Sequence, residues 1–74
     1  MNDPYENLAN SIILLAVKDY RDALKKLKKW PRNKTAQITK TEVESFFHST
    51  WYKELTSVDG KFLISKLQAE VEQL

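Results

Sequence analysis

The sequence has 74 residues, of which 42% are hydrophobic and 30% are charged, and its formal net charge is +2. A chain of this length forms one domain, so we expect residues 1–74 to fold as a single unit, and the composition excludes fibrous and disordered classes. The absence of cysteine excludes disulfides and thiolate metal sites, and no apolar run approaches the roughly 18 residues of a membrane span. We therefore expect a cytoplasmic protein with no membrane contact, and the single glycine and two prolines favour an all-α fold.

The first part of the chain is predicted to form one long helix from Asp3 to Trp30. Asp3 is a good N-cap, Pro4 suits the first helical position, and Glu6 has the spacing of a capping box. Pro31 ends the helix because it disfavours helical geometry at the residue before it. Apolar residues recur every three or four positions, as on one side of a helix: Tyr5, Leu8, Ile12, Ala16, Tyr20, Ala23, Leu24 and Leu27.

The middle of this helix carries more apolar residues than one buried face needs. Ile13, Leu14, Leu15 and Val17 broaden the apolar arc. We therefore expect later segments or another chain to cover the helix on two sides, and a homodimer is one candidate.

A polar connection follows Pro31, in which Asn33 is a candidate cap for a short turn, and the next helix is predicted to begin at Thr39 or Thr41. Both threonines are followed three residues later by glutamate, the spacing of a capping box. Phe46 and Phe47 lie on adjacent faces of this short helix, so we expect at least one of them to be buried against the first helix.

Two further breaks divide the second half of the chain. Ser49 either interrupts or recaps the chain before a helical turn around Trp51, and Asp59-Gly60 is a stronger break. The flanks of Asp59-Gly60 do not alternate as hairpin strands would, so Asp59 is predicted to cap a final helix. Its apolar side is formed by Leu63, Ile64, Leu67, Val71 and Leu74. The predicted fold is an all-α, small helical bundle of a long N-terminal helix, a short helix with a helical turn, and a C-terminal helix folded back on the first.

Charge is distributed unevenly along the chain. Residues 18–34 contain eight Lys and Arg residues and two acids, a net charge of +6, whereas residues 41–74 have a net charge of −3. Closely spaced cations bind a phosphate backbone because they release its counterions. The alternative is a solvated helix end, stabilised by the helix dipole and by pairs such as Asp22 with Lys26. The predicted basic partner surface comprises Lys18, Arg21, Lys25, Lys28, Lys29, Arg32 and Lys34.

Aromatic residues form a second candidate set: Trp30, Trp51 and Tyr52. Exposed Trp and Tyr are frequent interface anchors, and Trp30 lies beside the basic residues, although a domain this small first needs aromatic residues for its core. His48 has no cysteine or paired carboxylate at metal-ligand spacing, so we predict no metal and no cofactor. No nucleophile elbow, P-loop or HExxH motif is present, so we predict no catalytic residue and no enzyme activity.

Several runs resemble a largely uncharacterised family of small proteins from phages and integrative elements of Gram-positive bacteria. They are residues 5–10, 16–21, 46–52, 55–60 and 63–64, and the sequence departs from the family pattern between residues 35 and 42. The resemblance carries over no binding residues. It implies a setting among accessory genes of mobile elements, where small inhibitors of host defence, including anti-CRISPR proteins, are common, and hence the cytoplasm of a bacterial host cell.

These observations lead to two hypotheses about function. The first is a non-catalytic phage or mobile-element protein that binds a host protein or ribonucleoprotein complex and inhibits a defence nuclease, as anti-CRISPR proteins do. The alternative is a sequence-tolerant, nucleic-acid-binding regulator that uses the basic patch at residues 25–34. Self-association through the excess apolar surface of the long helix is a plainer third hypothesis.

Overall fold

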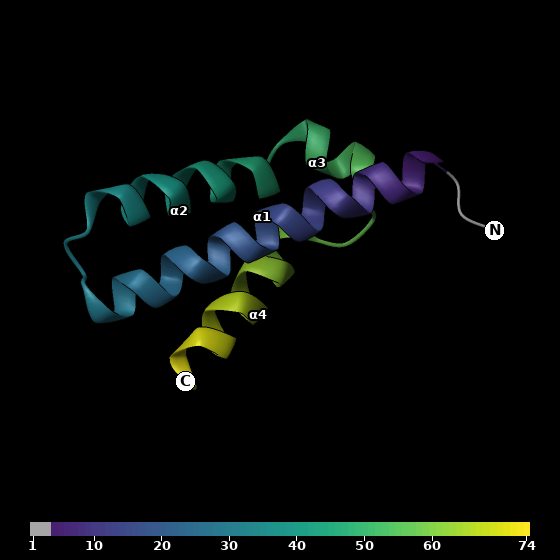
Figure 1. The fold of residues 1–74 in the computed structure, drawn as a ribbon. Coiled ribbons are helices and arrows are strands. Elements are labelled where there is room, and N and C mark those ends of the chain that lie inside the picture. Colours follow the sequence, from purple (N-terminus) through teal and green to yellow (C-terminus); the bar gives the residue numbers. More distant parts are fainter. Residues whose placement is uncertain (1–3) are drawn as a thin grey trace.

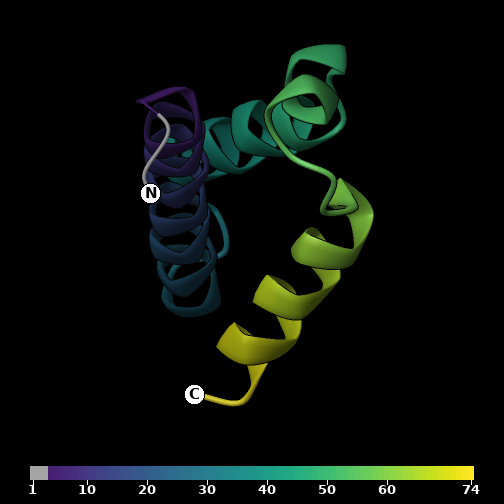
Figure 2. The same cartoon turned by 90° about the vertical axis from the view of Figure 1, so that its right-hand side faces the viewer.

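The computed structural model describes residues 4–74, and the side chains from Asn7 onward. Four helices follow one another: α1 (Pro4–Lys29), α2 (Lys34–Phe47), α3 (Thr50–Leu55) and α4 (Gly60–Glu72). α1 and α2 lie side by side and antiparallel (Figure 1), and α2, α3 and α4 all lie on one side of α1 (Figure 2). The principal extents are 42 × 22 × 18 Å. The predicted all-α bundle is confirmed, with the helical turn around Trp51 present as α3.

The long first helix ends where the sequence predicts. Trp30 still donates its backbone N–H to the Lys26 carbonyl oxygen at 2.7 Å, and Pro31 follows in a turn. The predicted N-cap, Asp3, lies outside the described residues.

The start of α2 differs from the prediction. The helix begins at Lys34, where the Asn33 side chain accepts a hydrogen bond from the backbone N–H of Ala36 at 2.9 Å, so the predicted starts at Thr39 and Thr41 are wrong. Asn33 satisfies one of the free N–H groups of the first turn, which is the work of an N-cap. The two threonines lie inside the helix, where the backbone N–H groups are already paired.

The other two helix starts are confirmed as capped. Ser49 Oγ accepts from the backbone N–H of Tyr52 at 3.1 Å, and Asp59 Oδ1 accepts from that of Lys61 at 3.0 Å. Gly60, the first residue of α4, lies directly against the end of α2, since a Cβ there would overlap the carbonyl oxygen of Phe47. The only glycine of the chain therefore serves a close approach between two helices.

The core lies where α1, α2, α3 and α4 meet, and Tyr20 is at its centre. Tyr20 is fully buried, and its ring packs edge-on against Phe47 with 6.0 Å between centroids. Its hydroxyl donates to Glu44 Oε2 at 2.6 Å and accepts from Gln68 Nε2 at 3.1 Å. One α1 side chain thus bonds to both α2 and α4. Phe47 is buried and Phe46 half-buried, as the pattern predicts. The core cluster consists of Tyr20, Val43, Phe47, Tyr52, Ile64 and Leu67.

The N-terminal half of α1 is covered only in part. Leu8, Leu14 and Leu15 are all at least 60% exposed, so the later segments of the chain do not enclose the broad apolar arc. Leu74, expected on the buried side of the last helix, is 71% exposed because it lies beyond the end of α4.

Candidate functional site

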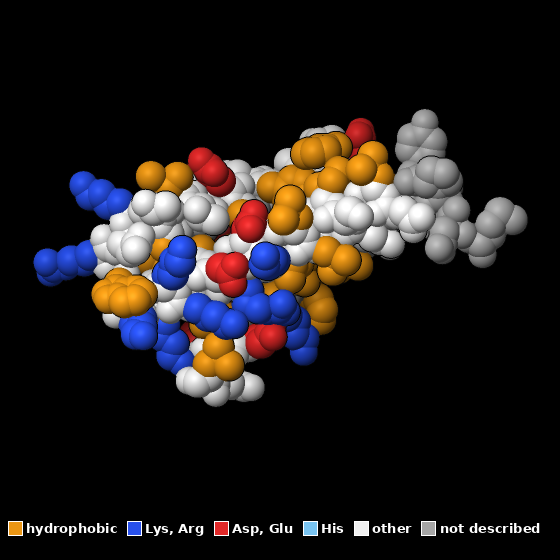
Figure 3. All heavy atoms as spheres, in the orientation of Figure 1, with side chains coloured by type: hydrophobic (Ala, Val, Ile, Leu, Met, Phe, Trp, Pro, Cys, Tyr) orange, Lys and Arg blue, Asp and Glu red, His pale blue; other side chains and the backbone are white. Residues whose placement is uncertain are grey.

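Cations concentrate at one end of the molecule, around the last turns of α1 and the turn into α2. On the face drawn in Figure 3, Lys and Arg side chains gather over this end, whereas the N-terminal half of α1 presents apolar and uncharged groups. Three lysines in the last turn of α1 lie where the helix dipole is negative, which favours them there.

Two of the predicted partner-binding cations make contacts within the chain. Arg21 donates from Nε and Nη2 to Glu70 Oε2 at 3.3 and 3.1 Å, which ties α1 to α4. Lys28 Nζ donates to the carbonyl oxygens of Val71, Glu72 and Leu74 at 3.1, 3.2 and 2.8 Å. Lys28 therefore pairs with carbonyl groups at the end of α4, where the helix leaves some of them without an intrahelical partner. Both side chains position α4 in this structure.

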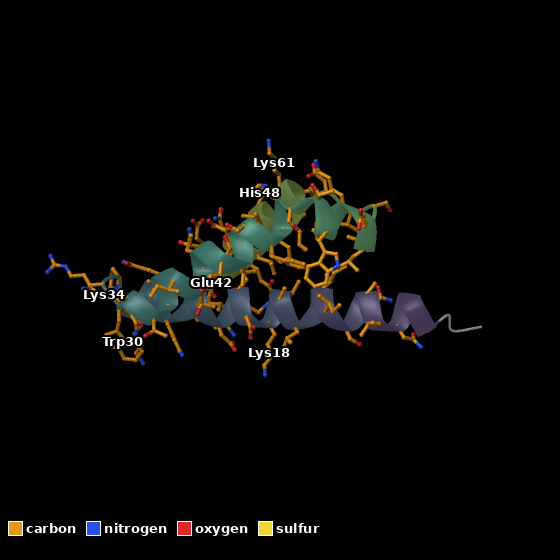
Figure 4. The ribbon with its side chains drawn as sticks, turned by 90° about the horizontal axis from the view of Figure 1, so that it is seen from above. Lys18, Trp30, Lys34, Glu42, His48 and Lys61 are labelled. Carbon is orange, nitrogen blue, oxygen red and sulfur yellow. The ribbon has the colours of Figure 1, made fainter. Side chains whose placement is uncertain are left out.

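The remaining cations at this end of the molecule are not paired with a carboxylate of the described residues. Among residues 7–74, none of them forms an ion pair, and the Asp22–Lys26 pair considered from the sequence is not formed. Lys26 belongs to this group although the sequence pattern pointed to pairing with Asp22. All five are exposed, and we call them, with Trp30, the basic end: Lys25, Lys26, Lys29, Arg32 and Lys34. Lys18 is exposed but lies midway along α1, pointing away from α2 (Figure 4).

Trp30 projects from the middle of the basic end. Its side chain is 55% exposed, and Lys29 Nζ lies over the ring, 5.1 Å from the centroid. Figure 4 places Trp30 and Lys34 at the same end of the molecule, where α1 passes into α2. An open hollow of about 480 Å³ is lined there by residues 29–33.

The other two predicted aromatic residues have different surroundings. Trp51 is 54% exposed and packs edge-on against Phe46, with 5.4 Å between ring centroids. Tyr52 is 1% exposed and belongs to the core, which corrects the prediction that it contacts a partner. A single helical turn holds both residues: Tyr52 points into the core formed with Phe47 and Ile64, whereas Trp51 contacts α2 through Phe46 and leaves half of its surface exposed.

A second hollow, of about 590 Å³, lies where α2 and α3 end and α4 begins. His48, Lys53 and Lys61 contribute to its lining, together with Asp59, whose carboxylate caps α4. The buried Tyr52 hydroxyl, also in the lining, has no hydrogen-bond partner among the described residues. Burial raises the pKa of this hydroxyl, and the nearby Asp59 charge raises it further. Lys53 and Lys61 bring positive charge to this hollow and Asp59 brings negative charge, so its lining is of mixed sign.

The most strongly perturbed titratable groups belong to the core. Burial raises the pKa of Tyr20, and its hydrogen bond to the Glu44 carboxylate raises it further. Burial also disfavours the charged form of Glu44, yet hydrogen bonds from Lys40 and Tyr20 outweigh this effect and leave the Glu44 pKa below its ordinary value of 4.5. These shifts come from contacts that hold α1 and α2 together.

Two further properties concern residues 4–74 as described. Among the side chains of residues 7–74, no group of three or more His, Asp or Glu lies close enough to hold a metal ion. None of the helices in residues 4–74 has the combination of length and hydrophobicity required to cross a bilayer.

Comparisons with known proteins give no information about the function of this protein. No family model matches the sequence, and neither the curated proteins nor the solved structures contain a match. The resemblance to small phage and integrative-element proteins therefore remains a prediction.

Proposed function

We propose that this protein is a non-catalytic binding protein whose basic end holds the phosphate backbone of nucleic acid. One observation carries this proposal: five exposed cations lie at the same end of the molecule as an exposed tryptophan, and none of them is paired with a carboxylate within residues 7–74. Unpaired cations gain most from phosphate, because binding releases the counterions condensed on the nucleic acid. The binding is tolerant of base sequence, since long flexible lysines contact phosphates rather than base edges.

The arrangement of the helices supports contact with the backbone rather than with base edges. The five cations come from the end of α1, the turn after it and the start of α2. A helix-turn-helix protein instead inserts one exposed recognition helix, set at about 90–120° to the helix before it, into the major groove. Here α2 runs antiparallel to α1 and packs along it (Figure 1).

Two matched triple variants test the proposal. Lys25, Lys29 and Arg32 are replaced by Ala in one, and Lys53, Lys61 and Lys66, all outside the basic end, in the other, so each variant loses three positive charges. We expect the first variant to lose retention of labelled DNA, with a salt slope reduced by about one per cation removed, and the second to keep it. Absence of DNA binding at low salt, or equal losses in the two variants, would refute the proposal.

A second candidate function is inhibition of a host defence nuclease by protein binding, in the manner of an anti-CRISPR protein. A specific observation favours it: the apolar face formed by Leu8, Ile12, Leu15 and Trp51 is exposed in large part. A groove of about 200 Å³ runs along this face and is lined also by Phe46. Exposed apolar surface with an aromatic residue at its edge is typical of protein interfaces.

The second candidate is tested in a Gram-positive host with an active CRISPR system. Leu8 and Leu15 are replaced together by Ser, which changes an exposed surface and leaves the core intact. We expect wild-type protein to lower interference against a targeted plasmid and to retain one effector complex after nuclease treatment, and the variant to do neither. Unchanged interference with wild-type protein excludes this function. A dimer in sedimentation equilibrium that the double variant abolishes would assign the apolar face to self-association instead.

A further inference from the structure

We infer that the basic end prefers single-stranded nucleic acid to duplex, because Trp30 offers a stacking surface for an unpaired base. This inference rests on the proposed nucleic-acid binding and specifies its substrate. Its support comes from the surroundings of Trp30, from the rigidity of the backbone at that residue, and from the cations close to it.

The indole of Trp30 has an accessible ring and no aromatic neighbour among the side chains of residues 7–74. Its side chain is 55% exposed, and Lys29 Nζ is the cation over its ring. Trp51 is almost equally exposed, but its ring packs against Phe46 and so contributes to the fold. Leaving a large apolar ring in water without packing forgoes the free energy of burial. A bound base would bury that ring.

The backbone around Trp30 is held on both sides. The Trp30 N–H donates to the Lys26 carbonyl at 2.7 Å, and the Trp30 carbonyl accepts from the Asn33 N–H at 3.0 Å. Pro31 fixes its own φ, and its carbonyl accepts from Gln37 Nε2 at 3.0 Å. Because the backbone that carries the Trp30 ring is already fixed, binding orders it little further. More of the stacking free energy therefore appears as affinity.

The chemistry of the site distinguishes single strands from duplexes. Bases in a duplex are stacked on one another and paired, so their faces are closed to an indole, whereas every unpaired base has a free face. Lys29 and Arg32 line the same hollow as Trp30, and Lys34 follows within the next turn. Cations close to a stacking ring hold the phosphates that flank a stacked base, as in proteins that bind single strands without sequence preference.

The test compares three labelled probes of equal length: an oligothymidine, an abasic strand with the same phosphates, and a duplex. Affinities are measured by fluorescence anisotropy at one salt concentration. A Trp51→Phe background makes Trp30 the only tryptophan, so its emission reports stacking directly. We expect the oligothymidine to bind more tightly than both other probes and to quench Trp30.

The variants separate stacking from charge. We expect Trp30→Ala to weaken oligothymidine binding by about 5- to 150-fold, the contribution of one stacked base, and to change binding of the abasic strand and duplex by less than twofold. We expect Trp30→Phe to bind oligothymidine more tightly than Trp30→Ala but less tightly than wild type. The matched change in the other exposed tryptophan, Trp51→Ala, leaves oligothymidine affinity unchanged. Circular dichroism confirms that each variant is folded.

Each opposite result overturns the inference. Equal affinities for the oligothymidine and the abasic strand, unchanged Trp30 emission, or an equal loss on all three probes in Trp30→Ala would show that Trp30 does not stack on bases. In those cases nucleic-acid binding by the lysines would still stand. If none of the probes binds at low salt, the proposed function itself is refuted, and the inference with it.

Discussion

Tyr20 in α1 donates a 2.6 Å hydrogen bond to Glu44 in α2, inside the core of the protein. Gln68 in α4 donates to the same tyrosine oxygen at 3.1 Å. The hydroxyl therefore uses its donor and an acceptor position within the fold and has no need of water. Tyr52 is equally buried, yet its hydroxyl has no hydrogen-bond partner among the described residues.

This contrast predicts opposite outcomes for the same substitution at two sites. Tyr20→Phe removes two hydrogen bonds and leaves the Glu44 carboxylate with one donor fewer, so we expect the free energy of unfolding to fall by about 1–3 kcal/mol. Tyr52→Phe removes a hydroxyl with no partner, so we expect it to be neutral or stabilising. Urea unfolding followed by circular dichroism measures both, and equal losses would contradict the assignment of the hydrogen bonds.

The second prediction concerns acid. The folded pKa of Glu44 lies below 4.5, so the ionised carboxylate stabilises the fold fully above pH 4.5 and loses this effect as the pH falls through its folded pKa. We expect the stability advantage of wild type over Glu44→Gln to be largest near pH 7 and to shrink below pH 4.5. The control is Glu42→Gln, which removes an exposed carboxylate from the same helix. The same pH dependence in both variants would exclude the contacts of Glu44 as the cause.

The third prediction concerns the glycine. An alanine in place of a helical glycine ordinarily stabilises a protein by reducing the freedom of the unfolded chain. At Gly60 the added Cβ would overlap the carbonyl oxygen of Phe47, a backbone atom that cannot turn aside. We therefore expect Gly60→Ala to destabilise the protein by about 1–3 kcal/mol, as overpacking does, and the exposed control Ser65→Ala to stay within about 0.5 kcal/mol. A rise in the urea midpoint of Gly60→Ala would show that α2 and α4 are not this close.

The fourth prediction separates structural from binding lysines. Lys28 donates to carbonyl groups at the end of α4, whereas Lys25, one turn earlier, has no ion-pair partner within residues 7–74. We expect Lys28→Ala to lower stability by about 0.5–1 kcal/mol and to speed amide exchange over the last turn of α4. We expect Lys25→Ala to leave stability and amide exchange unchanged and to weaken DNA binding.

This fourth prediction fails if the two lysine variants lose stability equally. Hydrogen exchange measured by mass spectrometry, peptide by peptide, locates the change. An effect of Lys28→Ala spread evenly over all helices, rather than concentrated at the end of α4, would also contradict the contact.

Much of the fold follows from local signals in the sequence. Pro31, Ser49 and Asp59 mark boundaries because proline geometry and side-chain caps act within a few residues of the chain. The start of α2 was predicted wrongly because Thr39 and Thr41 repeat the spacing of a capping box inside a helix that Asn33 had already begun. Spacing alone cannot distinguish a cap from an interior position.

The candidate site was less predictable, since it depends on residues far apart in the chain. No neighbour in the sequence distinguishes Arg21 and Lys28 as structural cations, because their partners lie more than 40 positions away, in α4 and just after it. Which of Trp51 and Tyr52 is buried depends on how α3 sits on the ends of α2 and α4. Both facts come from packing, which no local pattern contains.

The side-chain caps of the three later helices bear on how the chain folds. Asn33, Ser49 and Asp59 each accept a hydrogen bond from a backbone N–H only two or three residues away, so each helix start is defined without any distant contact. The turn that joins α1 to α2 is also short, from Trp30 to Asn33. Closing so short a turn costs little entropy, and proteins dominated by local contacts fold within microseconds to milliseconds. The α1–α2 pair needs only this local turn to close, and its closure alone brings the end of α1 and the start of α2, which carry the basic end, together.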